Sequence, residues 1–411
     1  MASTINTNVN SLNAQRNLMT SQSGLATAMQ RLSSGLRVNS AKDDAAGLAI
    51  AERMNSQIKG LAVAARNSND GISLAQTAEG ALGKVGDMLQ RMRELAVQAG
   101  NATNSTSDRK ALQAEVTQLS SEIDRVAKTT TFNGTKILDG SFSGAVFQVG
   151  ANSGDNITVG GLANAKGADL GSIKFAESSV TGISSSDVSS YSTAISTGNT
   201  TSGITISVSG TTAIDIGPIA AASSGSERIG QIAAAINAKT ADTGVTAFVS
   251  KQDNGTYNIE MRSSQMDNTD VNNPVAASVT LTGLTQANSG FDTGVQTISA
   301  ATDTNETKGI AAADVSTQAG AWTALKKIDA AIDKVNSSRA DLGALQTRFE
   351  NAVSNIAIQT ENTSASRGRI VDADFATETA NLSRSQILQQ AGTAMVAQAN
   401  QLPQGVLALL R

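Results

Sequence analysis

The side chains that most enzymes use for nucleophilic or metal chemistry are missing from this sequence. It contains no Cys and no His, which excludes disulfides, zinc–thiolate sites, Cys nucleophiles, Ser-His-Asp triads and the HExxH zinc motif. Asp and Glu remain as candidates for a hydrolytic or calcium-binding pair, but no EF-hand pattern is present. Residues 78–84 superficially resemble a phosphate-binding loop and lack its spacing. We therefore expect no catalytic residue, metal or cofactor.

Charge and hydropathy exclude two further classes of partner. The net charge is −4 at pH 7, unlike the basic surface of a nucleic-acid-binding protein. No apolar window reaches the roughly 18 residues that a membrane span needs. Residues 1–30 also lack the apolar stretch of a secretory signal peptide. We therefore expect neither nucleic acid nor membrane as a partner, and either a cytosolic protein or export by a dedicated machine.

Both ends of the chain carry apolar residues that alternate spacings of four and three, the period of a coiled-coil seam. The predicted polymerisation seam comprises Leu18, Leu25, Met29, Leu32 and Leu36, and Met395, Ala399, Leu402, Val406 and Leu409. Neither stripe is long or apolar enough to form a stable helix alone. We expect the ends to pair with each other and then with other copies of the chain, which predicts a polymer subunit rather than an enzyme. The alternative is intramolecular pairing only.

Long helices are predicted between the two ends. Residues 75–96, 112–126 and 325–356 keep the same apolar spacing, with Arg339 and Gln346 at two positions of the last stripe, and no Pro occurs before Pro218. An earlier helix, roughly residues 44–65, is expected to end at the turn-like run 67–71. Helices with matching stripes predict a bundle or rod.

The pattern changes around Phe132. The pairs Asn133-Gly134 and Asp139-Gly140 predict turns within a hairpin region over residues 131–175. Residues 176–300 are rich in Ser, Thr, Gly, Asn and Asp. They combine alternating segments at 204–208 and 213–216, a helical segment at 228–238 and a hairpin signal at 253–255. This composition predicts a small α/β insert.

The predicted fold class is mostly α. Long antiparallel helices form a terminal coiled coil and a helical rod with a short β-hairpin region, and a variable α/β insert domain lies at the far end. The expected domains are a terminal coiled-coil domain of residues 1–43 and 372–411, a rod domain of residues 44–175 and 301–371, and a surface-exposed insert of residues 176–300.

Several long motifs at both ends resemble those of bacterial flagellin. They lie at residues 5–8, 32–37, 43–50, 89–98, 132–134, 369–375 and 397–403. The resemblance covers about residues 1–175 and 310–411, and residues 228–262 are similar to an insert module of some flagellins. It implies a structural subunit that polymerises into the extracellular flagellar filament used for motility. It also implies unfolded export through the flagellar type III apparatus and terminal segments that become ordered only in the filament core.

The resemblance further implies a set of partners. These are other copies of the chain, an export chaperone at the C-terminal segment, filament cap and hook-junction proteins, and a host Toll-like receptor of innate immunity. The positions that match receptor recognition are Gln90, Arg91, Leu95, Gln98 and Glu115. In this interpretation Leu95 is an apolar anchor between charges. Alternatively, Arg91 and Arg93 are solvated charges and Leu95 faces the protein's own rod.

Two other interpretations of the chain remain open. A hook–filament junction protein would share the terminal pattern, and some flagellins display a peptidase in the insert, although the lack of His removes the zinc-dependent kind. Ser and Thr of residues 176–300 could carry O-linked glycans, but a plain hydrophilic surface is the preferred interpretation. Sequons at Asn156 and Asn305 are expected by chance in so Asn- and Thr-rich a sequence.

Overall fold

The computed structural model describes residues 8–195, 204–208, 213–252, 254–267, 275–289, 295–300 and 308–409. The chain forms two compact units, one of residues 1–72, 146–157 and 347–411 and the other of residues 73–145 and 158–346. The long helices α2 (Ala45–Ala99) and α7 (Gln318–Val371) contribute to both units. The three-part domain division predicted from the sequence stays a prediction.

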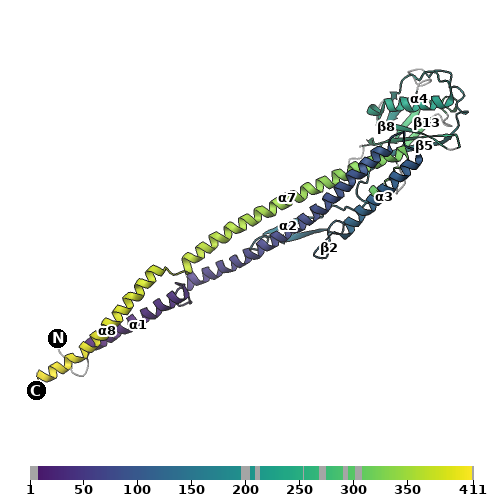
Figure 1. Cartoon of the computed structure of the whole chain (residues 1–411). Helices are drawn as coiled ribbons and strands as arrows, with labels where there is room; N and C mark the ends of the chain where they lie inside the picture. The colour runs from purple at the N-terminus through teal and green to yellow at the C-terminus, as the bar shows by residue number, and fades with distance from the viewer. Residues whose placement is uncertain are drawn as a thin grey trace. The chain divides into compact units, whose positions relative to one another are not determined.

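The first unit contains a pair of terminal helices, α1 (Val9–Ser34) and α8 (Phe375–Leu409), which lie side by side in Figure 1. Helix α1 begins at the N-cap Asn8, whose side chain accepts a hydrogen bond from the Ser11 amide, and ends at Gly35 with φ of 69°. This left-handed conformation favours Gly as a helix terminator. The predicted limits at residues 43 and 372 fall in the breaks that separate α1 from α2 and α7 from α8.

Short antiparallel backbone pairing joins those two breaks. The Arg37 amide donates to the Val371 carbonyl at 2.7 Å, and the Ala373 amide donates to the Gly35 carbonyl at 2.9 Å. The side chains of Val38 and Val371 are buried beside this pairing. The end of α1 and the start of α8 therefore lie next to each other, and this pairing marks one end of the terminal helix pair.

Helix α2 continues through residues 67–71, so the expected helix end at this run is wrong. The Ser68 hydroxyl donates to the Ala64 carbonyl at 2.9 Å and the Asn69 amide donates to the Ala65 carbonyl at 2.9 Å. These polar side chains thus bond to the backbone of their own helix instead of ending it. Gly71 lies against the buried ring of Phe349, and a Cβ at Gly71 would lie 2.6 Å from the ring's Cζ. The glycine makes room for the ring.

The second unit is built on α3 (Thr106–Thr129) and on the adjoining parts of α2 and α7, which share one core. The predicted stripes supply about half of the described buried residues of that core, including Leu82, Val85, Leu89, Met92, Val116, Ile123, Ile328, Val335 and Leu342. The two polar positions of the α7 stripe both contact Glu79, Arg339 by an ion pair of 3.6 Å and Gln346 by a hydrogen bond of 3.2 Å. Residues 78–84, which superficially resembled a phosphate-binding loop, lie within helix α2, and Glu79 of this segment contacts α7.

A capping box starts α3. The Asp108 amide donates to Ser105 Oγ at 3.2 Å, and the Ser105 amide and hydroxyl donate to the Asp108 carboxylate at 3.0 and 2.7 Å. The bonds from Ser105 lower the pKa of Asp108 below its ordinary value of 3.8. A carboxyl group with a lowered folded-state pKa stabilises the fold above its unfolded pKa, and this contribution disappears as the pH falls through the folded value.

We therefore predict that Ser105→Ala raises the pKa of Asp108 toward its ordinary value, because the substitution removes the largest cause of the shift. The first turn of α3 in the variant lacks this side-chain cap. Lowering the pH through the pKa of Asp108 should therefore destabilise that turn less than it does in the unsubstituted protein. NMR titration of the Asp108 carboxyl group in both proteins measures the pKa. An unchanged value in the variant would contradict the assignment of Ser105 as its cause.

Two small hairpins follow α3. The first joins β1 (Thr131–Phe132) to β2 (Thr135–Lys136) through Asn133 and Gly134, whose φ angles of 47° and 77° are both positive, as a type I′ turn requires. The second pairs β3 (Gly144–Gln148) with β4 (Asn156–Gly160). The short 3-10 helix η1 (Ile310–Ala312) then hydrogen-bonds to the loop at residues 167–170.

The insert is an antiparallel sheet of seven strands in the order β7-β6-β12-β13-β5-β9-β8. Its strands are β5 (Ala176–Ile183), β6 (Thr205–Val208), β7 (Ile214–Asp215), β8 (Val245–Lys251), β9 (Tyr257–Ser263), β12 (Val279–Thr282) and β13 (Val295–Ala300). The other elements are α4 (Gly225–Ala238), α5 (Thr240–Thr243), α6 (Gln286–Ser289) and the pair β10 (Met266–Asp267) with β11 (Val275–Ala276).

Helix α4 packs on this sheet (Figure 1). Its Ile229, Ile232 and Ile236 are fully buried against strand residues, and Asn237 exchanges two hydrogen bonds with the backbone of Ala247 on β8. The predicted fold class is confirmed, with terminal paired helices, long packed helices, short β-hairpins and an α/β insert. In the part of the chain that the structure describes, no helix combines the length and apolar character needed to span a bilayer.

Candidate functional site

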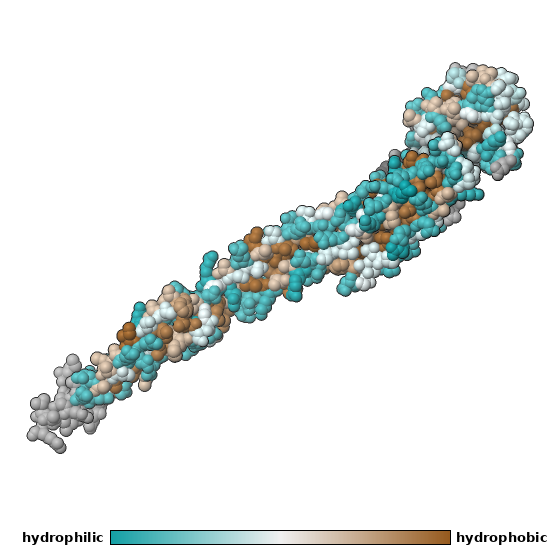
Figure 2. Space-filling view, viewed as in Figure 1, coloured by the Kyte–Doolittle hydropathy of each residue, from teal (hydrophilic) through white to brown (hydrophobic). Residues whose placement is uncertain are grey.

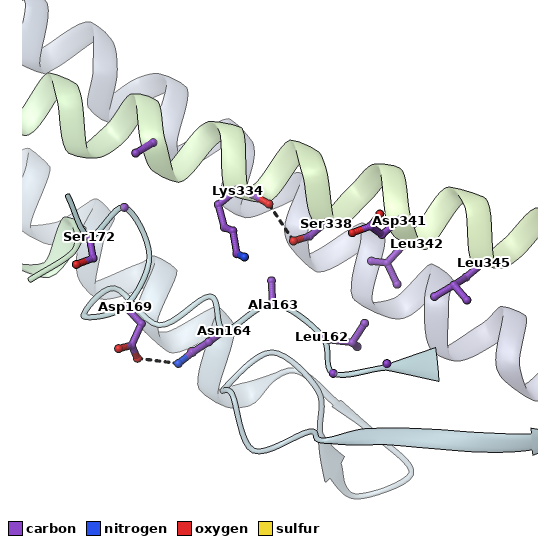
Figure 3. Close-up of a pocket in the computed structure, with 14 residues that line it drawn as sticks. Leu162, Ala163, Asn164, Asp169, Ser172, Lys334, Ser338, Asp341, Leu342 and Leu345 are labelled. Atoms are coloured by element: carbon purple, nitrogen blue, oxygen red, sulfur yellow. Dashed lines mark hydrogen bonds between the residues drawn. The ribbon is translucent and has the colours of Figure 1, made fainter. Parts of the chain in front are cut away.

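A cavity of about 690 Å³ in the second unit lies between the loop at residues 160–172 and α7. Figure 3 shows Lys334 pointing into it, opposite Asp169 and Asn164. Asn164 donates to Asp169 at 2.7 Å and Ser338 donates to the Lys334 carbonyl at 2.9 Å, so both bonds hold local structure together. Among the described residues, no group of three or more Asp and Glu side chains is placed to hold a metal ion.

The terminal helix pair provides the most extensive candidate interface. Most of the buried and half-buried positions of the two helices follow spacings of three and four. These positions are Ser11, Ala14, Leu18, Ser21, Leu25, Ala28 and Leu32 on α1, and Glu378, Leu382, Ser385, Gln389, Gly392, Val396 and Ala399 on α8. Such spacing is that of a coiled coil. The seam combines medium-sized apolar side chains with small and polar ones.

Small residues let the two helices approach closely. A Cβ built on Gly392 would lie 3.1 Å from Leu18 Cδ1, and one built on Gly24 would lie 3.5 Å from Ser385 Oγ. Two contacts at opposite ends of the pair fix its antiparallel register. Asn8 donates to the Ala399 carbonyl at 2.7 Å, and the Arg31 guanidinium lies 4.0 Å from the Glu378 carboxylate.

The structure divides the predicted polymerisation seam into two groups. Leu18, Leu25, Leu32, Leu36 and Ala399 are buried or half-buried within the chain, whereas Met29 and Met395 are exposed. The side chains of Leu402, Val406 and Leu409 lie outside the described residues. The spacing predicted the pairing of α1 with α8, but Met29 and Met395 are 54 and 64% exposed and lie outside its buried and half-buried positions.

A second set of apolar side chains faces outward from the same two helices. Figure 2 shows apolar patches on the surface of the terminal helix pair among hydrophilic side chains. At least half exposed are Val9, Leu12, Met19 and Met29 on α1, and Phe375, Ile387, Leu388 and Met395 on α8. Leu12 and Met19, like Leu388 and Met395, are seven residues apart and so share one face. Each helix therefore carries an uncovered apolar row beside its paired row. We call these the outer rows: Leu12 and Met19 on α1, and Leu388 and Met395 on α8.

The predicted receptor-recognition residues form a charged cluster on the second unit. The Arg91 guanidinium donates to Glu115 at 2.9 Å and to Glu94 at 2.9 Å, and these two bonds raise the pKa of Arg91. Arg91 and Glu115 belong to different helices, α2 and α3, and both are exposed. The structure thus brings Arg91 and Glu115 together, and Glu94 joins them.

Leu95 departs from its expected place as an anchor between the charges. It is 1% exposed and lies in the core that α2 shares with α3 and α7, so its side chain faces the protein's own interior. Gln90 and Gln98 are exposed and, with Arg93, Glu94 and Val97, line a shallow groove. Val97 is 54% exposed. It is the apolar group at this surface that the sequence analysis missed, and its position seven residues after Gln90 on one helical face could have revealed it.

Three family models match the chain. The bacterial flagellin N-terminal helical region matches residues 5–143, the C-terminal helical region matches residues 325–410, and the flagellin hook IN motif matches residues 194–265. The B-type flagellin of Pseudomonas aeruginosa is 38% identical, and the alignment spans 100% of both chains. The chain belongs to the bacterial flagellin family.

Other flagellins are similar over the same extent. Flagellin B of Vibrio cholerae is 40% identical across 100% of both chains. Among solved structures, FliC from Burkholderia pseudomallei is 26% identical, with a TM-score of 0.36, and its match covers 68% of this chain and 99% of that one. Membership in the flagellin family identifies this chain as a self-polymerising structural subunit of the flagellar filament, not an enzyme.

Proposed function

We propose that the outer rows of α1 and α8 are the surfaces through which this flagellin-family chain polymerises into the extracellular filament. The observation that carries the proposal is the exposure of large apolar side chains, Leu12 and Met19 on one helix and Leu388 and Met395 on the other. Such rows gain free energy when a second apolar surface removes them from water. A contact between unlike surfaces that does not close on itself gives an open helical polymer.

We also propose that the chain passes unfolded through the flagellar type III apparatus. It would then join the filament at the distal tip, beneath a cap and beyond the hook-junction proteins. The terminal helix pair supports unfolded export because few of its side chains are buried. Only Ser11 and Ala28 of α1 are fully buried, and Glu378 and Ala399 are the corresponding described residues of α8. Helices with so little burial form only when packing offsets the loss of conformational entropy. The sequence also has no Cys and hence no disulfide that would oppose unfolding.

Electron microscopy of purified protein after the addition of short filament seeds tests this function. We expect the seeds to lengthen with time and protein concentration. Seeds that keep their length while the protein remains folded and monomeric would refute polymerisation through this chain. Intact mass of the same sample reports whether the Ser and Thr of residues 176–300 carry glycans.

The exposed face of α8 also suits an export chaperone that binds a helix in a groove. Ile387 and Leu388 are exposed before the chain assembles, so such a partner would cover the apolar surface that subunits cover later. Calorimetric titration of the flagellar chaperone into the full chain and into a chain that lacks residues 372–411 tests the site. Equal affinity for both would place the chaperone elsewhere.

For the host Toll-like receptor, we propose a contact centred on the Arg91–Glu115 pair, with Gln90, Gln98 and the exposed Val97 beside it. Leu95 supports the backbone of α2 from inside and does not touch the partner. The proposal rests on the match of these positions to the flagellin pattern and on their exposure. Arg at the centre of an interface frequently dominates its binding energy.

Arg91→Ala is expected to weaken receptor activation by monomer roughly thirtyfold, since it removes an interfacial Arg of the kind that acts as a hot spot. A cellular reporter assay over a concentration series measures the shift. Arg125→Ala is the matched control, because Arg125 is an exposed arginine of α3 that pairs within its own helix with Glu122. Equal responses of the Arg91 variant and the unsubstituted protein would remove this residue from the proposed contact.

A further inference from the structure

The methionines of this chain divide by location. The sequence has nine, and the structure describes the side chains of Met19, Met29, Met54, Met88, Met92, Met261 and Met395. Met19, Met29 and Met395 are 68, 54 and 64% exposed, whereas Met92 and Met261 are fully buried and Met54 and Met88 are half-buried. Every exposed methionine among the described residues therefore lies on α1 or α8.

Two of the three exposed methionines belong to the outer rows. Met19 follows Leu12 by seven residues, and Met395 follows Leu388 by seven, so each thioether extends the apolar face of its neighbour. Met29 lies beside the paired row of α1, ten residues after Met19. A thioether is soft and unbranched, which suits a contact that must fit several neighbouring helices. The same exposure leaves the sulfur open to solvent oxidants.

We propose that Met19, Met29 and Met395 are oxidation sites whose conversion to the sulfoxide prevents filament growth. This regulation rests on the proposed role of the outer rows in polymerisation. The reactant is a peroxide such as hydrogen peroxide. The thioether sulfur attacks one peroxide oxygen, the O–O bond breaks and an S–O bond forms. The sulfur is oxidised by two electrons, and the peroxide is reduced to one water molecule.

The consequence follows from polarity. The sulfoxide is polar and accepts hydrogen bonds, so covering it with an apolar surface leaves that acceptor without a partner. In the unassembled chain the sulfoxide stays in water, and the fold of the chain is unaffected. In an assembled filament the same three sulfurs are covered by other copies. Oxidation should therefore act on subunits before assembly and spare those already incorporated.

The first arm of the test is peptide mapping by mass spectrometry after brief treatment of monomer with hydrogen peroxide. Met19, Met29 and Met395 are expected to oxidise first, and Met92 and Met261 last. The second arm is the rate at which treated monomer elongates filament seeds, which should fall roughly tenfold or more because polar groups are buried at the contact. Subsequent treatment with methionine sulfoxide reductases should restore the rate.

Leucine variants separate the sulfur from the shape of the side chain. In the triple variant Met19→Leu, Met29→Leu, Met395→Leu, peroxide treatment should leave the elongation rate at the variant's own untreated value, because the oxidisable sulfurs are gone. The matched control is Met54→Leu with Met88→Leu, which should remain as sensitive as the unsubstituted protein. Equal inhibition of the triple variant, or growth of the oxidised protein at the untreated rate, would overturn the proposal.

The two arms also distinguish this proposal from the function on which it rests. If untreated protein does not elongate seeds, polymerisation itself fails, and control by oxidation fails with it. If untreated protein elongates seeds and mapping finds Met92 or Met261 oxidised as fast as Met395, the terminal sites are not selective, and only the oxidation proposal is lost.

Discussion

A chain carrying Leu388→Asp and Met395→Asp is expected to remain a folded monomer and to elongate filament seeds roughly a hundredfold more slowly. Both substitutions lie on the outer row of α8, outside the contact with α1. An aspartate there is solvated in the monomer, but polymerisation would cover a carboxylate that has no partner. Burying an unpaired charge costs several kcal/mol, and each 1.4 kcal/mol is about tenfold in an equilibrium.

Two comparisons isolate the outer row as the cause. Gln386→Asp with Gln390→Asp adds the same charge to exposed polar positions of the same helix, and this variant should elongate seeds at a rate within a few-fold of the unsubstituted protein. Deletion of residues 372–411 should leave a soluble chain that does not polymerise. Circular dichroism of each monomer checks that the helices persist. Normal filaments from the truncated chain would rule out α8 as part of the polymer contact.

The terminal pairing shows both the strength and the limit of pattern analysis. The alternation of four and three predicted correctly that each end forms a helix needing a partner. The orientation of the α1 stripe was predicted only in part. The apolar spacing favoured Met29, whereas the structure places Ala28 in the contact. Small residues form such contacts because they let backbones approach closely, and a search for large apolar residues overlooks them.

Leu95 shows why a single helix face does not settle what a residue touches. Helix α2 packs against both α3 and α7, so its buried surface is wider than one heptad stripe and includes Leu95 and Ala99 beside Met92. The match to the receptor-recognition positions suggested an exposed anchor beside Arg91 and Glu115. Only the positions of the two neighbouring helices show that this leucine faces inward while Val97 faces out.

The sheet order of the insert could not be obtained from the sequence. Alternating apolar residues predicted strands at 204–208 and 213–216, and the hairpin of β8 with β9 followed from a turn signal whose first residue, Asp253, lies outside the described residues. The pairing of β5 with both β9 and β13 joins segments that are far apart in the chain. Which distant strands become neighbours depends on how the connections between them let the strands pack into one core. The local apolar periodicity of each strand does not indicate this.

Gly71→Ala is expected to lower the free energy of unfolding by about 1–3 kcal/mol, although Ala is intrinsically the better helix former. The added Cβ would meet Phe349 Cζ at 2.6 Å and both Cε atoms at 2.9 Å. That ring is fully buried and packs edge-on against Phe147 at 5.5 Å between centroids, so it has little room to move. Hydrogen exchange at the α2 amides around residue 71 measures the local loss.

Gly80→Ala provides the control within the same helix, because Gly80 is exposed and a Cβ there has nothing within 4 Å. This substitution should stabilise α2 by about 0.5–1 kcal/mol, the usual gain from replacing Gly by Ala inside a helix. Combining Gly71→Ala with Phe349→Leu should cost less than the sum of the two single substitutions, since the smaller side chain removes the clash. A gain in stability at position 71 equal to that at position 80 would show that the ring moves aside freely, and would contradict the packing role of Gly71.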